Sequence, residues 1–257
     1  MWCASQRRTH FTDRSAFVLL DGLMDMSSSL RNLGAYFDES MSMTEHVNHL
    51  VRSCFNQLRR IRFIRRSLTT TVATRLVNSF VIARVDYCNS ILAWLPKYQL
   101  SRNQSVLNVA ARIVYDQARF EHLTPTLWDR LHWLRIPERI DFKRCLLVFK
   151  ALHELAPVYI QNYCVEVSPR RCLWSSSQCH LVIPPPSNTV LFGERSFAVG
   201  GPSLWNHLPD NVNEDESIEL LKQNLKTHLF RQSFEISTFS LFCNSALDFG
   251  HDHATAL

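Results

Sequence analysis

The chain has 257 residues, of which 46% are hydrophobic and 20% are charged, and its formal net charge is +5. A chain of this length can bury a sizeable core, and these proportions are typical of a soluble globular protein. Only six glycines occur, which argues against an all-β design, and no Gly-x-x-x-x-Gly-Lys phosphate loop is present. No apolar run approaches the roughly 20 residues of a membrane span. We therefore expect a mainly α-helical protein that has no membrane partner.

The charge is unevenly distributed along the chain. Residues 44–150 contain 18 Lys and Arg against 7 Asp and Glu, a difference of +11, whereas residues 207–257 contain 3 against 8, a difference of −5. A basic helical block is suited to bind a polyanion, and nucleic acid is the most common polyanion that proteins bind.

The eight cysteines are spread through apolar stretches, and none belongs to a Cys-x-x-Cys pair. Such usage is typical of reduced, buried thiols, and the start of the chain has no signal-peptide pattern. We therefore expect the protein in the nucleus or cytoplasm. Cys164, Cys172, Cys179 and His180 form the one candidate metal cluster. Their spacing matches no zinc-finger or zinc-knuckle pattern, so scattered thiols are the preferred interpretation.

A short β-hairpin is predicted before the first helix. Residues 17–20 form its first strand, a turn follows at Ser27–Ser29, and residues 30–38 form its second strand, in which alternate side chains point to opposite faces. Next, Ser42 and Glu45 have the spacing of a helix capping box. The apolar residues of the helix that follows share one face, as expected for a core-facing helix; they are Val47, Leu50, Val51, Cys54, Leu58 and Ile61.

Four arginines of this helix, Arg52, Arg59, Arg62 and Arg66, lie on a separate stripe because seven residues make almost two helical turns. We call them the basic stripe. Two interpretations are open. The stripe can follow a phosphate backbone, releasing counterions on binding, or it is the solvated face of a surface helix.

Two helices separated by Pro96 are predicted next, since proline cannot continue the first of them. The spacing of the apolar residues predicts one buried face on the first helix; these residues are Leu76, Phe80, Ala83, Tyr87, Ile91 and Trp94. The second helix begins near Ser101, and its predicted apolar side contains Leu107, Ala110, Ala111 and Val114.

The rest of the chain is predicted to contain one long helix, a linker and a small terminal module. The long helix begins at Pro137, with Ile140, Leu147, Val148, Ala151 and Leu155 facing inward. Residues 166–188 are rich in Ser and Pro and indicate a linker. Residues 180–183 and 189–192 are possible short strands. The terminal helix ends at Phe230, with Ile218, Leu221, Leu225 and Leu229 inward, and a loose tail follows.

Several sequence words resemble one known family in the family's order. They are LRNLGAYFD, SFVIARVDYCNSIL, NVAARIV, HLTPTLWDRLHWLRIPERIDFK, FKALHELAP, GERSFAVGGPSLWNHLP and LKQNLKTHLF, and together they span about residues 29–230. The chain resembles the region downstream of the catalytic palm in the reverse transcriptases of jockey-like non-LTR retrotransposons, the long interspersed elements (LINEs). The resemblance implies a helical, thumb-like bundle preceded by a β-hairpin similar to the primer-gripping element.

This resemblance supplies the expected domains. They are 1–43, the end of the palm with its hairpin; 44–165, a basic helical domain; 166–188, the linker; 189–232, a small mixed α/β carboxy-terminal module; and 233–257, the tail.

The resemblance also implies that the catalytic centre is missing. The family holds two Mg²⁺ ions on a pair of adjacent aspartates, as nucleotide transfer requires, and no Asp-Asp pair occurs in this chain. The fingers and most of the palm would precede residue 1. We therefore expect no enzymatic activity from this chain alone, no cofactor, no catalytic residue and no metal ligand.

Two functional hypotheses follow. In the first, the chain is a fragment of an RNA-directed DNA polymerase that binds RNA or an RNA–DNA hybrid, with the missing polymerase domains as possible partners. The residues predicted to bind nucleic acid are Arg52, Arg59, Arg62, Arg66, Arg75, Arg84, Lys97, Arg102 and Arg112. In the second, it is a non-catalytic helical interaction module or an unselected transposon relic, and its charge only solvates the surface.

Overall fold

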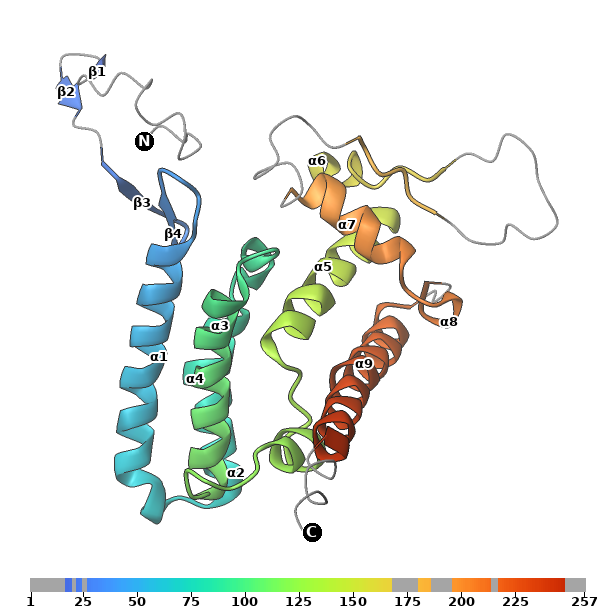
Figure 1. Ribbon diagram of the computed structural model, residues 1–257. Coiled ribbons are helices and arrows are strands. Elements are labelled where there is room, and N and C mark those ends of the chain that lie inside the picture. Colours follow the sequence, from blue (N-terminus) through green and yellow to red (C-terminus); the bar gives the residue numbers. More distant parts are fainter. Residues whose placement is uncertain are drawn as a thin grey trace, which may run out of the picture. The chain divides into compact units, whose positions relative to one another are not determined.

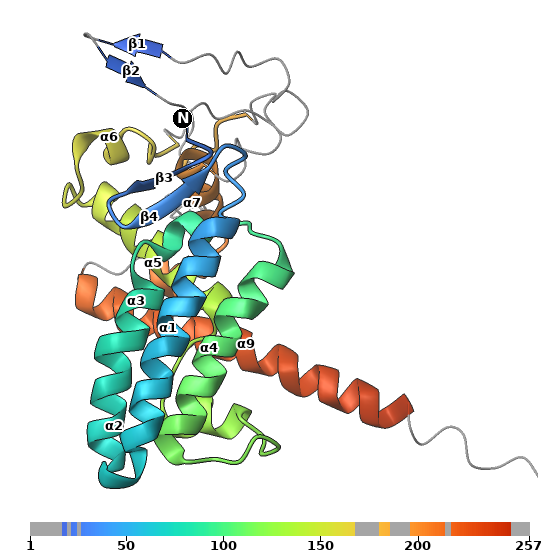
Figure 2. The ribbon, with the colours of Figure 1, turned by 90° about the vertical axis from the view of Figure 1, so that its left-hand side faces the viewer.

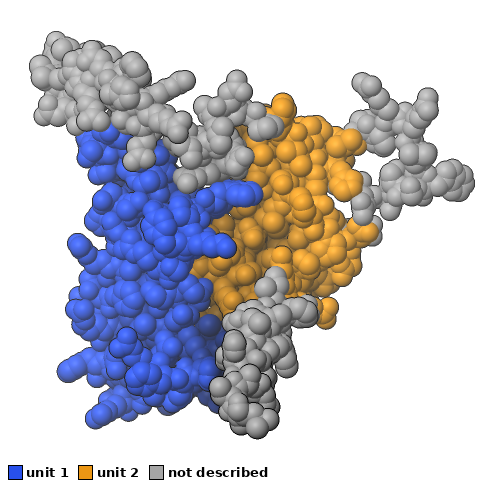
Figure 3. All heavy atoms as spheres, viewed as in Figure 1, with its two compact units in different colours: residues 1–132, 186–195 blue, residues 133–185, 196–257 orange. Residues whose placement is uncertain are grey.

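A computed structural model describes residues 17–19, 22–24, 27–167, 180–185, 196–213 and 217–247. Of these described residues, 67% are helical. This confirms the predicted mainly α-helical fold with a short antiparallel hairpin near the amino terminus (Figure 1). The chain forms two compact units, coloured separately in Figure 3. Unit 1 comprises Met1–His132 and Pro186–Arg195, and unit 2 comprises Trp133–Pro185 and Ser196–Leu257. The predicted domain 44–165 therefore contributes to both units.

Unit 1 begins with two hairpins rather than the single one expected. Strands β1 (Phe17–Leu19) and β2 (Gly22–Met24) pair antiparallel, and β3 (Ser29–Asn32) pairs with β4 (Ala35–Asp38). The predicted continuous strand 30–38 is therefore wrong, because the chain reverses at Leu33 and Gly34. Gly34 has a φ of +87°, which glycine adopts without a steric penalty.

Helix α1 (Thr44–Ile64) follows and ends in a short 3₁₀ turn, η2 (Arg65–Ser67). Four of the six residues of its predicted inward face, Val47, Cys54, Leu58 and Ile61, are buried, whereas Leu50 and Val51 are half-buried. The capping box is not formed as predicted, because Met43 occupies the N-cap position in a left-handed conformation without a side-chain cap bond. The Ser42 hydroxyl still accepts a hydrogen bond from the Thr44 N–H (3.3 Å) while donating to Asp38 (2.6 Å).

The chain then runs back beside α1 through four short helical segments: α2 (Thr70–Val77), the π-helical η3 (Asn78–Ile82), α3 (Ala83–Asp86) and the 3₁₀ segment η4 (Asn89–Leu92). In Figure 2, α2 and α3 lie alongside α1. The predicted buried face of this region is wrong: Phe80, Tyr87 and Trp94 are exposed. The inward side chains are instead Val77, Val81, Ile82, Val85 and Leu92.

Helix α4 (Lys97–Tyr115) completes the bundle of unit 1, starting directly after Pro96 rather than at Ser101. Leu107, Ala110, Ala111 and Val114 are buried as predicted. Helix α4 runs parallel to α1, because Gln99 Nε2 donates to Thr44 Oγ1 (2.9 Å) near the start of both helices and Arg65 contacts α4 at its other end. A π-helical turn, η5 (Thr126–Arg130), follows.

At the end of α4, the Arg65 side chain donates to three backbone carbonyls, all at 2.7 Å. Nε bonds to the Ile113 oxygen, Nη2 to the Val114 oxygen and Nη1 to the Leu68 oxygen. Two of these acceptors belong to the last turn of α4, whose carbonyls have no partner within the helix. One arginine therefore caps α4 and joins it to the turn after α1.

Unit 2 contains α5 (Ile136–Leu152), α6 (Val158–Gln161), α7 (Phe197–Asn206), α8 (Asp210–Asn213) and α9 (Ile218–Leu247). Its core gathers around Phe149 of α5 and Trp205 of α7, whose ring centroids are 6.5 Å apart. The predicted inward residues Ile140, Val148, Ala151, Leu221, Leu225 and Leu229 are buried, whereas Leu155 is exposed. Helix α9 continues to Leu247, past residue 233 where a loose tail was predicted.

The segment around Leu181 is held in unit 2 by Asn206. The Leu181 N–H donates to Asn206 Oδ1, and Asn206 Nδ2 donates back to the Leu181 carbonyl, both at 2.9 Å. Leu181 also forms an antiparallel bridge with Glu166. The other possible strand, residues 189–192, lies outside the described residues. Within the described part of the chain, no helix is both long and apolar enough to cross a membrane.

Candidate nucleic-acid interface

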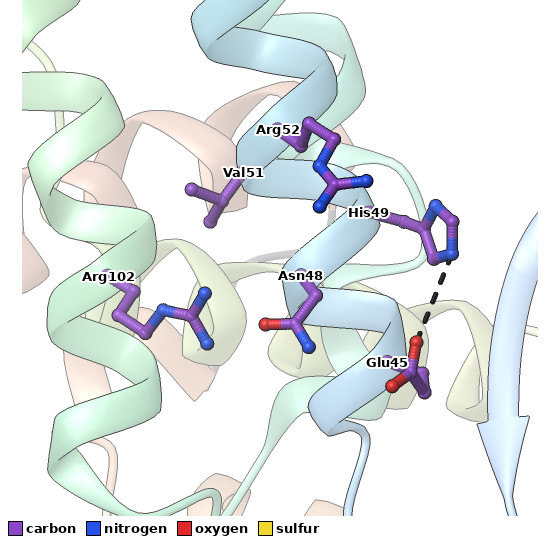
Figure 4. Close-up of a pocket in the computed structure, with 6 residues that line it drawn as sticks. All are labelled: Glu45, Asn48, His49, Val51, Arg52 and Arg102. Carbon is purple, nitrogen blue, oxygen red and sulfur yellow. Dashed lines mark ion pairs between the residues drawn. The ribbon is translucent and has the colours of Figure 1, made fainter.

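A shallow hollow between α1 and α4 brings two of the predicted basic residues together. It is lined by Glu45, Asn48, His49, Val51 and Arg52 of α1 and by Arg102 of α4, and it encloses about 440 Å³. Figure 4 shows the Arg102 guanidinium extending from α4 toward Asn48, with Arg52 one turn further along α1. Because α1 and α4 run in parallel, residues 50 positions apart in sequence lie on one surface.

The carboxylate in this first hollow is directed at a histidine. Glu45 Oε2 lies 4.0 Å from His49 Nε2 on the next turn of α1, and both side chains are about half exposed. The lining contains two guanidiniums against this one carboxylate, so the hollow favours an anionic ligand.

A second hollow of about 590 Å³ lies between the β3–β4 hairpin, α1 and α3. Its lining residues include two arginines, two histidines and two tyrosines but no acidic side chain; they are Arg31, Gly34, Tyr36, His46, His49, Leu50, Ser53, Ala83, Arg84 and Tyr87. His49 lines both hollows. The two hollows are thus parts of one surface on unit 1.

Aromatic and cationic groups are stacked along the second hollow. The Tyr36 and His49 rings lie parallel, with centroids 4.1 Å apart and an interplanar angle of 8°, and the Arg31 guanidinium lies 5.7 Å from the centre of the Tyr36 ring. Arg84 Nη1 donates to Ser53 Oγ (2.6 Å), which orients the guanidinium of a predicted site residue. Flat rings and oriented guanidiniums are the groups that contact bases and phosphates in single-stranded nucleic acid.

Tyr87 fixes the hairpin to the helical bundle. Its hydroxyl donates to the Leu33 carbonyl (2.6 Å), and a Cβ added at Gly34 would lie 3.3 Å from the same ring. The absence of a side chain at Gly34 therefore allows the hairpin turn to approach Tyr87 closely and holds Arg31 and Tyr36 over α1.

The structure places eight of the nine predicted nucleic-acid-binding residues at the surface. Those that are exposed are Arg52, Arg59, Arg62, Arg66, Arg75, Arg84, Lys97 and Arg102. Arg112 is half-buried, and among the described residues its Nε has no hydrogen-bond partner. Arg52 and Arg102 line one hollow and Arg84 the other. The other five exposed residues, Arg59, Arg62, Arg66, Arg75 and Lys97, line neither.

Arg31 and the neutral residues that share this surface were not predicted from the sequence. Asn48, His49 and Tyr36 come from two elements, and their stacking depends on how the hairpin folds against α1. The one available signal was the i, i+4 spacing of Glu45 and His49, which places them on one helical face.

His46 is the buried polar residue behind the second hollow. Its Nδ1 accepts a hydrogen bond from the Tyr36 N–H (3.4 Å), and among the described residues its Nε2 has no partner. Burial, followed by the nearby His49, lowers the pKa of His46 below its ordinary value of 6.5. The neutral imidazole is therefore the form that the fold favours.

A pH dependence of stability follows from this lowered pKa. Below about pH 6.5 the unfolded chain takes up a proton at His46 that the folded chain does not accept, so the free energy of unfolding falls as the pH is lowered. The loss stops once the pH is below the folded pKa, because both states are then protonated. Urea unfolding of the wild type and His46→Gln between about pH 7.5 and 5 checks this. If the free energy of unfolding had the same pH dependence in both proteins, His46 would not be the source of the effect.

The described residues contain no group of three or more His, Cys, Asp or Glu side chains placed to hold a metal ion. Of the candidate cluster, Cys172 and Cys179 lie outside the described residues. Cys164 is buried as a free thiol in unit 2, and burial raises its pKa to about 11.

Comparisons with known proteins give no relative. No protein-family model, curated protein or solved structure matches the chain.

Proposed function

We propose that this chain binds RNA or an RNA–DNA hybrid through the basic surface of unit 1, as a non-catalytic segment derived from a non-LTR retrotransposon reverse transcriptase. The observation that carries the proposal is the pair of adjoining hollows. Arg52 of α1 and Arg102 of α4 line the first, and Arg31 and Arg84 line the second together with the stacked Tyr36 and His49 rings. The sequence words described above support the origin.

The side chains of this surface suit recognition of the nucleic-acid backbone more than of base edges. Arginine guanidiniums pair with phosphates. The basic stripe runs along α1 into the 3₁₀ turn η2, and its members Arg52, Arg59 and Arg66 are seven residues apart, about two helical turns. The surface offers a few flat rings for unpaired bases. We therefore expect affinity to depend strongly on salt and weakly on sequence.

Neutralising the basic stripe tests the proposal. Replacing Arg52, Arg59, Arg62 and Arg66 with glutamine should weaken binding to an RNA–DNA hybrid about tenfold or more. It should also flatten the slope of log K against log salt by roughly 3 to 4, because each lost phosphate contact removes about 0.9 from it. Fluorescence anisotropy across a salt series measures both quantities, with a structured RNA as the second ligand.

A control of equal charge separates local contacts from net charge. Arg119, Arg130, Lys143 and Arg231 are exposed, and changing these four to glutamine removes the same charge elsewhere. We expect the control to retain most of the affinity and the salt slope. Equal losses in the two variants, or no binding by the folded wild type, would contradict the proposal.

A further inference from the structure

Unit 1 has an apolar groove between the end of α1 and the α2–η3 segment. We define the apolar groove by its lining residues Gln57, Arg59, Arg60, Ile61, Phe63, Ile64, Leu76 and Phe80, which enclose about 550 Å³. Helix α1 forms one wall, and the α2–η3 segment, which together with α3 we call the returning helix, forms the other. Figure 2 shows α1 and α2 side by side. Only Arg59 belongs also to the proposed nucleic-acid surface.

The large side chains of the apolar groove are unusually exposed. Phe63 is 90% exposed, Phe80 46% and Ile64 44%. Val72, also exposed, extends the row of Leu76 and Phe80 by one turn at a spacing of four residues, so three apolar side chains follow one face of the returning helix. Apolar rows of this kind, edged by polar residues, mark interaction sites.

The returning helix therefore has two apolar faces. Val77, Val81 and Val85 repeat every four residues and are buried in the bundle, while Leu76 and Phe80 repeat on the adjacent face and line the groove. The inner face meets the needs of the bundle core. The outer face contributes little to that core. Its apolar residues are four positions apart, a spacing into which a second helix can pack its own apolar residues at i, i+3, i+4 and i+7.

The edge of the groove indicates the charge of its partner. Arg59 and Arg60 line it, and none of its eight lining residues is acidic. Arg62 and Arg66 are exposed on the following turns of the same segment. A partner with an apolar row and acidic residues beside it would bury Phe63 and Phe80 and pair with the guanidiniums of Arg59 and Arg60.

We propose that the apolar groove binds an amphipathic helix of a partner protein, with leucine or phenylalanine on one face and glutamate or aspartate flanking them. This function goes beyond nucleic-acid binding and shares only Arg59 with the proposed nucleic-acid surface. The partner's apolar residues lie between Phe63 and Phe80, and its carboxylates pair with Arg59 and Arg60.

A designed peptide provides the probe. The full chain is titrated into a fluorescein-labelled helical peptide that has leucines at i, i+3, i+4 and i+7 with flanking glutamates, and into a second peptide with lysines in place of the glutamates. The acidic peptide should bind about tenfold or more tightly than the basic one. Arg60→Glu should reduce or reverse that preference.

Substitutions of exposed side chains test the groove without disturbing the core. Phe63→Gln together with Phe80→Gln should weaken acidic-peptide binding about tenfold. Phe120→Gln, at a position that is 94% exposed and outside the groove, should leave it unchanged. Affinity for the RNA–DNA hybrid should be the same in the double variant as in the wild type, so failure of this proposal is distinguishable from failure of the nucleic-acid proposal.

Three results would overturn the inference. The first is equal binding of the acidic and basic peptides, or no binding of either. The second is displacement of the bound peptide from the groove by the hybrid, accompanied by loss of hybrid binding in the double variant, which would assign the groove to nucleic acid. The third is self-association of the wild type that the double variant abolishes, which would assign the groove to a second copy of the chain.

Discussion

Replacing Arg65 with glutamine is expected to lower the free energy of unfolding by about 2 to 4 kcal/mol, because hydrogen bonds that involve a charged group contribute more than neutral ones. The Arg65 guanidinium donates to three carbonyls within 2.7 Å. Glutamine is shorter and has no charge, so it cannot span from the turn after α1 to the last turn of α4. The carbonyls of Ile113 and Val114 also lose a cation near the negative end of the helix dipole.

The neighbouring arginine is the matched control. Arg66 is exposed and belongs to the basic stripe, so Arg66→Gln should change the free energy of unfolding by less than about 0.5 kcal/mol. It should nevertheless weaken binding of the RNA–DNA hybrid. Urea unfolding followed by circular dichroism, together with anisotropy, measures both effects. A similar loss of stability in the two variants would show that the Arg65 bonds contribute little.

These two arginines show what helical spacing reveals and what it does not. Spacing separated Arg66 from Arg65, because residues 52, 59 and 66 return to one side of a helix every two turns. Nothing in the local sequence indicates that Arg65 reaches Ile113, which is 48 residues away. The acceptor is a backbone carbonyl and therefore carries no signature of its own.

Local pattern was sufficient where a helix has a single apolar face. Most of the predicted inward residues of α1 and all four of α4 are buried, because in each helix the buried apolar residues recur on a single face. The region of Leu76 to Trp94 has two competing apolar rows of similar spacing. Packing against α1 and α4 buries the row of Val77, Val81 and Val85. The sequence of this one segment does not indicate which of the two rows is buried.

The candidate site likewise has one part that the sequence indicated and another that it did not. The basic stripe was visible in the sequence because its members follow one another along α1 and the turn that continues it, η2. The hollows were not, since Arg102 approaches Arg52 only through the parallel packing of α1 and α4, and Tyr36 reaches His49 only after the chain turns at Gly34. A single strand over residues 30–38 was the natural prediction from alternation. The left-handed backbone at Leu33 and Gly34 overrides it.

Unit 2 depends on the burial of α9, and Leu225→Ala is expected to lower its free energy of unfolding by about 2 to 5 kcal/mol. Leu225 has no exposed surface and packs in the cluster that contains Phe149 and Trp205. Removing its side chain loses apolar burial and leaves a space that neighbouring side chains fill only in part. Urea unfolding monitored by tryptophan fluorescence, which includes Trp205, measures the change.

Leu220 on the same helix is the matched control, because it is 47% exposed and the change to alanine there costs about 0.5 kcal/mol or less. Equal effects of Leu220→Ala and Leu225→Ala would mean that α9 does not pack with its Leu221–Leu225–Leu229 face inward. A large effect confined to Leu225 has a further consequence. If, under conditions where unit 2 has unfolded, the RNA–DNA hybrid binds the Leu225→Ala variant as tightly as it binds the wild type, unit 1 is sufficient for binding, as the proposed function requires.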